Sequence, residues 1–315
     1  MRVLVSGATG AVGKALVPRL VERGHDVVAT TRSPSRAGLV EAMGATPLVL
    51  DVLDGTAVGE AVARVQPEVI VHQATALSGT PDLRRFDRWF ETTNRLRTEG
   101  TGHLLAAAQA TGVRRVVAQS YTGWTNARDG GPSKSEDDPL DPEPLPAQHR
   151  SIAAIRHLER AVTDAPVEGI VLRYGNFYGP GASEGLVDLV RRRRFPIVGD
   201  GAGVWSWIHV EDAATATIAA VQHGGRGVYN VVDDEPAPVS AWLPALAEAV
   251  GAPPPLRVPR WVGRLAAGAV PVRWMTEGRG ASNAKIKRAL GWEPRWASWR
   301  DGFREALGAA AARPA

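Results

Sequence analysis

A glycine-rich turn near the start of the chain constrains its fold more than any other feature. An apolar run, Val3 to Ser6, leads into Gly7, Gly10 and Gly13, and an amphipathic segment follows from Lys14 to Arg23. This order predicts a strand, a tight turn and a helix, where a bare backbone and a helix N-terminus can hold a pyrophosphate. The pattern predicts dinucleotide binding. Because its spacing departs from Gly-x-Gly-x-x-Gly, the alternative is a tight turn without a ligand.

The residues after this turn complete a strand-helix-strand unit and indicate which dinucleotide it takes. Gly24 is placed to end the helix, and Val27 to Thr31 reads as a second buried strand. Such a strand normally ends in an acidic residue that binds the ribose 2′-hydroxyl, but here Thr31, Arg32 and Ser33 follow. Arg32 favours a 2′-phosphate and hence NADP(H), with NAD as the alternative cofactor if Arg32 is only a solvated loop residue.

Composition limits the class of protein and its partners. The 315 residues, 44% hydrophobic and 22% charged, are typical of a globular protein of one or two domains. No cysteine is present, which excludes disulfides, thiolate metal sites and a cysteine nucleophile. No apolar block has the length of a signal peptide or membrane span, so we expect a cytoplasmic protein that binds no membrane. Basic residues are scattered apart from Arg191 to Arg194, so we expect a small-molecule substrate, no nucleic acid, and a homodimer as a possible assembly.

Strand-like and helical segments alternate through the first half of the chain. This alternation predicts an α/β, Rossmann-type doubly wound parallel sheet, and the proline-rich second half predicts a smaller C-terminal domain that covers the substrate. We expect residues 1–177 with about 206–232 to bind the dinucleotide, and about 178–205 with 233–315 to form the substrate domain. Further strands are predicted at Pro47–Leu50, Val69–His72, Arg115–Gln119 and Val167–Arg173, and helices at Thr56–Val65, Arg88–Thr111 and Ala147–Thr163.

Several motifs, in this order along the chain, resemble those of the extended short-chain dehydrogenase/reductases, the NAD-dependent epimerase/dehydratase group. Besides the glycine turn they are Asp51-Val52, His72-Gln73-Ala74, Arg173 to Gly181, Gly199-Asp200-Gly201, Ile208 to Asp212 and Leu290 to Pro294. The resemblance implies that Gly7, Thr9, Gly10, Ala11, Val12 and Gly13 line the pyrophosphate. It likewise implies that Asp51 and Val52 contact the adenine, Ala74 and Thr75 border the ribose and phosphates, and Tyr174 and Gly175 lie beside the nicotinamide.

The catalytic residues match this group less well. Ser120 matches its active-site serine or threonine, although a serine that caps the end of the fifth strand is the alternative. Members that move hydride use a Tyr-x-x-x-Lys pair, and the helix register places Ser151 and Ile155 at those positions. Tyr178 is another candidate proton donor, with a half-buried structural aromatic as the alternative. Ser120, Ser151 and Tyr178 are therefore the predicted catalytic residues, and no metal-binding spacing is evident.

A second departure concerns the substrate. Where relatives that act on nucleotide sugars place a phosphate-binding arginine, this chain has Trp205. Trp205 and Trp207 should face opposite sides of a strand, one toward the pocket and one toward the core. The sequence thus favours an NADP(H)-dependent oxidoreductase of a small carbonyl or hydroxyl metabolite. The alternatives are a cofactor-binding sensor or regulatory protein without catalysis, and a non-redox isomerase or lyase.

Overall fold

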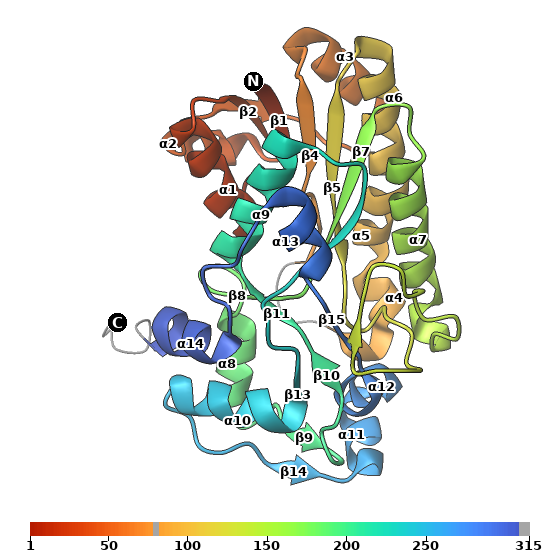
Figure 1. The fold of residues 1–315 in the computed structure, drawn as a ribbon, viewed down its shortest axis with the longest axis vertical. Helices are drawn as coiled ribbons and strands as arrows, with labels where there is room; N and C mark the ends of the chain where they lie inside the picture. The colour runs from red at the N-terminus through yellow and green to blue at the C-terminus, as the bar shows by residue number, and fades with distance from the viewer. Residues whose placement is uncertain (78–81, 309–315) are drawn as a thin grey trace.

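The computed structural model describes residues 1–77 and 82–308, and its centre is a parallel sheet of seven strands (Figure 1). The strands lie in the order β12-β7-β5-β4-β1-β2-β3. Their order reverses between β1 and β4, and α/β sheets bind ligands beyond the carboxyl ends of the strands at such a switch point. The bounds are β1 (Arg2–Ser6), β2 (Asp26–Thr31), β3 (Thr46–Val49), β4 (Val69–His72), β5 (Arg115–Tyr121), β7 (Glu168–Tyr174) and β12 (Gly227–Val231).

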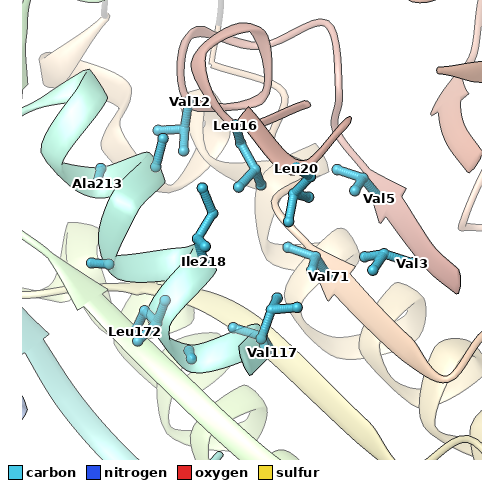
Figure 2. Close-up of a cluster of buried hydrophobic side chains, with 14 of the residues drawn as sticks. Val3, Val5, Val12, Leu16, Leu20, Val71, Val117, Leu172, Ala213 and Ile218 are labelled. Carbon is cyan, nitrogen blue, oxygen red and sulfur yellow. The ribbon is translucent and has the colours of Figure 1, made fainter. Parts of the chain in front are cut away.

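Helices cover both faces of the sheet, because successive side chains of a strand point in opposite directions. Val3 and Val5 of β1 pack with α1 and α9 on one face (Figure 2). Leu4 packs with α3 and α6 on the other face, where α7 covers β5 and β7. The sheet is therefore doubly wound, which confirms the predicted fold class. These helices are α1 (Ala11–Glu22), α3 (Gly55–Val65), α6 (Thr101–Thr111), α7 (His149–Thr163) and α9 (Val210–His223).

Most predicted elements are present with ends displaced by one or two residues. The strand β12 was missed, and the predicted helix Arg88–Thr111 consists of consecutive helical segments. The segments in this region are α4 (Phe86–Trp89), α5 (Glu91–Arg95), a π-helical turn (Leu96–Gly100) and α6. The remaining longer elements are α2 (Ala37–Ala42), β8 (Asn176–Tyr178), α8 (Glu184–Arg191), β11 (Trp207–His209), α10 (Val239–Ala249), α11 (Arg260–Ala267), α12 (Ala269–Glu277), α13 (Ala284–Leu290) and α14 (Trp299–Gly302). The two-residue strands are β6 (Ser133–Lys134), β9 (Ile197–Val198), β10 (Val204–Trp205), β13 (Ala237–Pro238), β14 (Arg257–Val258) and β15 (Gly280–Ala281).

A second apolar cluster, rich in aromatic rings, is built from residues between Tyr178 and Leu307. Trp205 and Trp207 both belong to it: they are 4% and 1% exposed, and both rings lie 4.8 Å from the ring of Trp242. The prediction that the two indoles face opposite sides of one strand is therefore wrong, because residues two apart on a strand lie on the same face. The chain changes partners at Ser206, because β10 pairs with β13 whereas β11 pairs with β8.

Acid should destabilise the fold through His72. This β4 side chain is 3% exposed, its Nε2 lies 3.2 Å from the carbonyl oxygen of Leu96, and burial lowers its pKa from 6.5 to about 4. The unfolded chain binds this proton below pH 6.5 and the folded chain only near pH 4. The stabilisation present above pH 6.5 is therefore lost as the pH falls through this window, by roughly 3 kcal/mol at its lower end.

Urea unfolding at pH 7 and pH 5 measures this effect. His72→Gln should make the free energy of unfolding depend less on pH. The dependence that remains should come from His209, because burial also lowers the pKa of His209 to about 4. An unchanged slope in His72→Gln would contradict the assignment.

Candidate active site

The glycine turn forms an open cradle between β1 and α1. Gly7 has a φ of +88°, and a Cβ there would lie 2.6 Å from the backbone of Gln73, while a Cβ on Gly13 would lie 2.4 Å from the carbonyl oxygen of Ala8. A Cβ on Gly10 would meet only the Gly7 carbonyl oxygen, at 3.3 Å. Gly7 and Gly13 are thus required by close packing, whereas the space beside Gly10 is free. That space fits the pyrophosphate of a dinucleotide.

The start of α1 faces this space without a side-chain cap. Gly10 is the N-cap residue with an extended backbone, and its amide donates to the carbonyl oxygen of Gly7 at 3.1 Å. The first amides of a helix have no partner within it and favour an anion. The predicted contacts Thr9, Ala11 and Val12 lie within this segment and would present mainly backbone groups. The local chemistry therefore suits a phosphate group.

The ends of β2 and β3 border the same edge of the sheet. Arg32 follows β2, is exposed, and forms no ion pair with another residue of 1–77 or 82–308. Asp51 is exposed after β3 and accepts a hydrogen bond from the amide of Leu53 at 3.0 Å, while Val52 is buried. Arg32 is thus a positively charged group at this edge that is available to a ribose phosphate.

The carboxyl ends of β4 and β7 are joined by a buried hydrogen-bond chain. Gln73 Nε2 donates to the Tyr174 hydroxyl at 2.9 Å, and this hydroxyl lies 2.6 Å from Thr217 Oγ1. Burial raises the pKa of Tyr174 to about 12. Its side chain thus bonds the end of β4 to α9, and a contact of Tyr174 and Gly175 with the nicotinamide stays a prediction. Ala74 and Thr75 follow Gln73 and are half-buried.

The predicted helix register places Ser151 and Ile155 at the positions of the family's tyrosine and lysine, and these side chains offer neither a phenol nor an amine. Ser151 Oγ donates to Asp87 Oδ1 at 2.7 Å and accepts from Asn94 Nδ2 at 3.1 Å. Ile155, one turn later on α7, is fully buried in an apolar cluster with Phe86. Ile155 therefore offers no charge that could lower the pKa of a neighbouring proton donor.

Ser120 belongs to a buried ionic network. Its hydroxyl donates to Glu159 Oε1 at 2.8 Å, and Arg173 binds the same carboxylate through Nε and Nη2, both at 2.7 Å. Ser120 is 1% exposed and Glu159 7%. In this arrangement the serine proton is directed at Glu159, so a role toward substrate stays a prediction.

Tyr178 lies in the second apolar cluster. It is fully buried, its ring packs against Trp207, His209 and Phe303, and burial raises its pKa well above the ordinary range. Its hydroxyl has no hydrogen-bond partner among the described residues. The structure thus gives Ser120, Ser151 and Tyr178 separate partners and does not bring the three predicted catalytic side chains into one cluster.

Sequence reasoning missed Tyr121 as a polar group at the end of β5. Its hydroxyl donates to Asn176 Oδ1 at 2.9 Å, its ring stacks on Trp124, and burial raises its pKa. A signal was available in the sequence: Tyr121 directly follows Ser120 at the carboxyl end of the strand, so side-chain alternation directs it to the face opposite Ser120.

In the described ranges no three His, Asp or Glu side chains are grouped to hold a metal ion. None of the helices described is long and apolar enough to cross a membrane.

The chain matches the model of the NAD dependent epimerase/dehydratase family over residues 3–231, and it belongs to this family. It is 45% identical to 3-diazoavenalumate denitrifying reductase from a Streptomyces species, over 96% of this chain and 99% of that protein. It is 28% identical to 2-alkyl-3-oxoalkanoate reductase of Stenotrophomonas maltophilia, over 80% of this chain and 77% of that protein. The structure of Thermus thermophilus UDP-glucose 4-epimerase with NAD matches with a TM-score of 0.74 at 24% identity, over 99% of this chain and 100% of that one, which confirms the fold.

Proposed function

We propose that this protein is a reductase that binds a nicotinamide dinucleotide along the glycine turn and reduces a small molecule beyond the ends of β4, β5 and β7. The open space beside Gly10, at an uncapped helix N-terminus, is the observation on which the proposal rests. The 45% identity to a reductase over nearly the whole chain supports it. Residues 1–177 with about 206–232 would hold the dinucleotide, and 178–205 with 233–315 would cover the substrate.

The proposed cofactor is NADPH, because Arg32 replaces the acidic residue that would select NADH. A charge-assisted hydrogen bond contributes about 1.5 to 3 kcal/mol, so Arg32→Ala should weaken NADPH binding roughly ten- to hundredfold and leave NADH binding nearly unchanged. Fluorescence titration of both nucleotides measures this. Arg23→Ala, an exposed arginine at the opposite end of α1, is the matched control. Equal affinity of the unmodified protein for the two nucleotides would reject the proposal.

Ser151 and Ile155 bear on the substrate class. When bound, the dinucleotide supplies hydride. Reduction of a carbonyl also consumes a proton at the developing alkoxide, for which the family's tyrosine is absent here. An aryl diazonium ion takes up one hydride and gives the arene and dinitrogen, which balances atoms and charge without a further proton. The name of the Streptomyces relative specifies a diazo compound and loss of nitrogen. We therefore propose an aryl diazo compound as the substrate and retain small carbonyl compounds as the second candidate.

Consumption of NADPH in the presence of aryl diazonium salts and of small ketones and aldehydes tests the proposal. We expect turnover of diazonium compounds with release of dinitrogen, and the reaction without enzyme is the control. Turnover of carbonyl compounds alone would favour the second candidate. NADPH binding without turnover of either class would favour the sensor alternative.

A further inference from the structure

A cavity outside the glycine turn lies between α11, α12 and the loop that precedes α7. Its volume is about 450 Å³, which is within the range of small-molecule sites. Arg260, Arg264 and Arg273 line it together with the indole of Trp261 and the carboxylate of Glu277. The cavity therefore combines guanidinium groups with an aromatic face.

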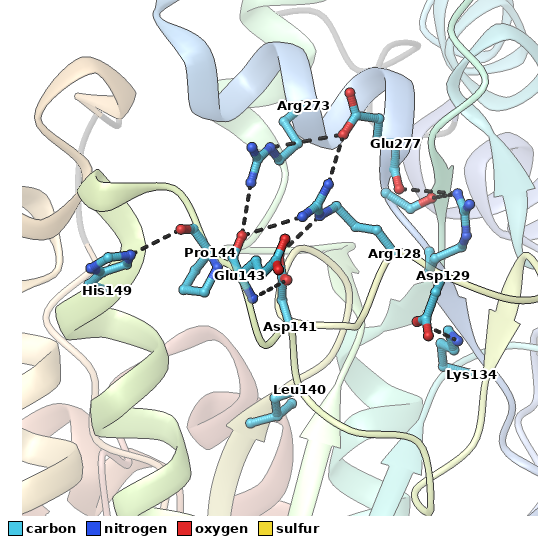
Figure 3. Close-up of polar contacts among 12 residues, drawn as sticks. Arg128, Asp129, Lys134, Leu140, Asp141, Glu143, Pro144, His149, Arg273 and Glu277 are labelled. Atoms are coloured by element: carbon cyan, nitrogen blue, oxygen red, sulfur yellow. Dashed lines mark hydrogen bonds and ion pairs between the residues drawn. The ribbon is translucent and has the colours of Figure 1, made fainter.

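Three arginines line the cavity with one glutamate, and Asp200 lies 3.9 Å from Arg260. Glu277 Oε2 accepts a hydrogen bond from Arg128 at 3.3 Å and lies 3.9 Å from Arg273 (Figure 3). Arg260 approaches the same carboxylate only to 4.0 Å. Arg264 forms no ion pair within the described ranges 1–77 and 82–308. Burial and the neighbouring Arg128 lower the pKa of Arg273. An anion in the cavity would relieve this repulsion.

The apolar part of the lining suits an aromatic ring. Trp261 is 65% exposed although it lies on a packed helix, and Leu145 and Val272 also line the cavity. An indole face stacks favourably on another ring, and the planar fork of an arginine binds a carboxylate through two parallel hydrogen bonds. An aromatic ring that bears a carboxylate satisfies both requirements at once.

Arg273 also faces a second cavity, beside the segment that follows β5. The same side chain lines a much smaller cavity with Trp124 and Gln148. Trp124 lies just beyond β5, and Gln148 lies three residues before Ser151 at the start of α7. Arg273 is thus the residue that the α11–α12 cavity shares with the segment beyond β5.

From these observations we infer that the α11–α12 cavity binds the carboxylate of an aromatic acid and that the substrate belongs to this class. The statement about substrate rests on the proposed reductase function. The statement that the cavity binds an aromatic acid does not rest on that function, because binding can be measured without turnover.

Calorimetric titration of the full chain with cinnamate, and with the neutral cinnamamide as the matched ligand, tests the inference. We expect cinnamate to bind at least about tenfold more tightly, since only the acid can accept charge-assisted hydrogen bonds. Arg273→Gln should weaken cinnamate binding about tenfold and the more exposed Arg264→Ala about threefold, with little effect on cinnamamide. Arg160→Ala, an exposed arginine near the far end of α7, should change neither affinity.

Equal affinity for acid and amide, or unchanged cinnamate binding in both Arg264→Ala and Arg273→Gln, would overturn the inference. Uridine diphosphate that binds more tightly than cinnamate and is weakened by the same variants would also overturn it, in favour of a phosphate ligand. The protein could also bind cinnamate more tightly than cinnamamide, lose this binding in the two arginine variants, and yet reduce no compound. That result would support the inference about the cavity and contradict the proposed function.

Discussion

Gly10→Val should abolish dinucleotide binding and leave the fold intact. The backbone of Gly10 has a φ of −78° and a ψ of 175°, an extended conformation that valine adopts readily. Its new Cβ would meet only the carbonyl oxygen of Gly7 at 3.3 Å, so the branched side chain would fill the free space of the cradle. Because a pyrophosphate needs that space, we expect NADPH affinity to fall by at least roughly a hundredfold.

Substitutions at two other glycines serve as controls for this experiment. Gly59→Val on α3 should preserve binding, because a Cβ there meets nothing within 4 Å. Gly13→Val should instead damage folding, since its Cβ would lie 2.4 Å from two carbonyl oxygens. Circular dichroism and nucleotide titration together separate the three cases. Normal NADPH binding by a folded Gly10→Val protein would mean that the dinucleotide, if bound, lies elsewhere.

The glycine turn and the strands around it were predictable because their signals are local. The spacing of Gly7, Gly10 and Gly13 and the short apolar runs depend only on neighbouring residues. The position of Ile155 was predictable for a similar reason, since α7 keeps one helical register from Ser151 to Glu159. Local pattern therefore identified the glycine turn and the helix α7, while the match of Ser151 and Ile155 to the family's tyrosine and lysine stays a prediction.

The contacts of the site depend on distant residues and could not be read in the same way. The partner of Ser120 is Glu159, 39 residues away, and Ser151 bonds to Asp87, 64 residues away. The Ser206 side chain, which lies between the two indoles in the sequence, exchanges hydrogen bonds with the backbone of Ala281, 75 residues away. No spacing rule in the sequence reports such tertiary pairings.

Removal of the Glu159 carboxylate should be among the most destabilising single changes. Glu159 neutralises Arg173, which is 6% exposed, and its charge also favours the charged form of the buried Arg97. Glu159→Leu would leave buried guanidinium charge without a partner, which costs about 3 to 5 kcal/mol of unfolding free energy. Glu60→Leu on the exposed side of α3 removes the same charge and should change the unfolding free energy by less than about 0.5 kcal/mol. Urea denaturation of the two variants provides the comparison, and equal midpoints would contradict a stabilising role for the network.

Ser120→Ala connects this network to the predicted catalytic role of the serine. The substitution removes one hydrogen bond to a charged group, so stability should fall by about 1.5 to 3 kcal/mol, less than in Glu159→Leu. Loss of one well-placed donor to a reacting oxygen costs about a hundredfold or more in turnover. A large fall in kcat at unchanged stability and unchanged NADPH affinity would therefore mean that the hydroxyl turns from Glu159 toward the substrate. A fall in stability with nearly normal kcat would mean that Ser120 acts only by holding Glu159, which is the arrangement that its 2.8 Å hydrogen bond favours.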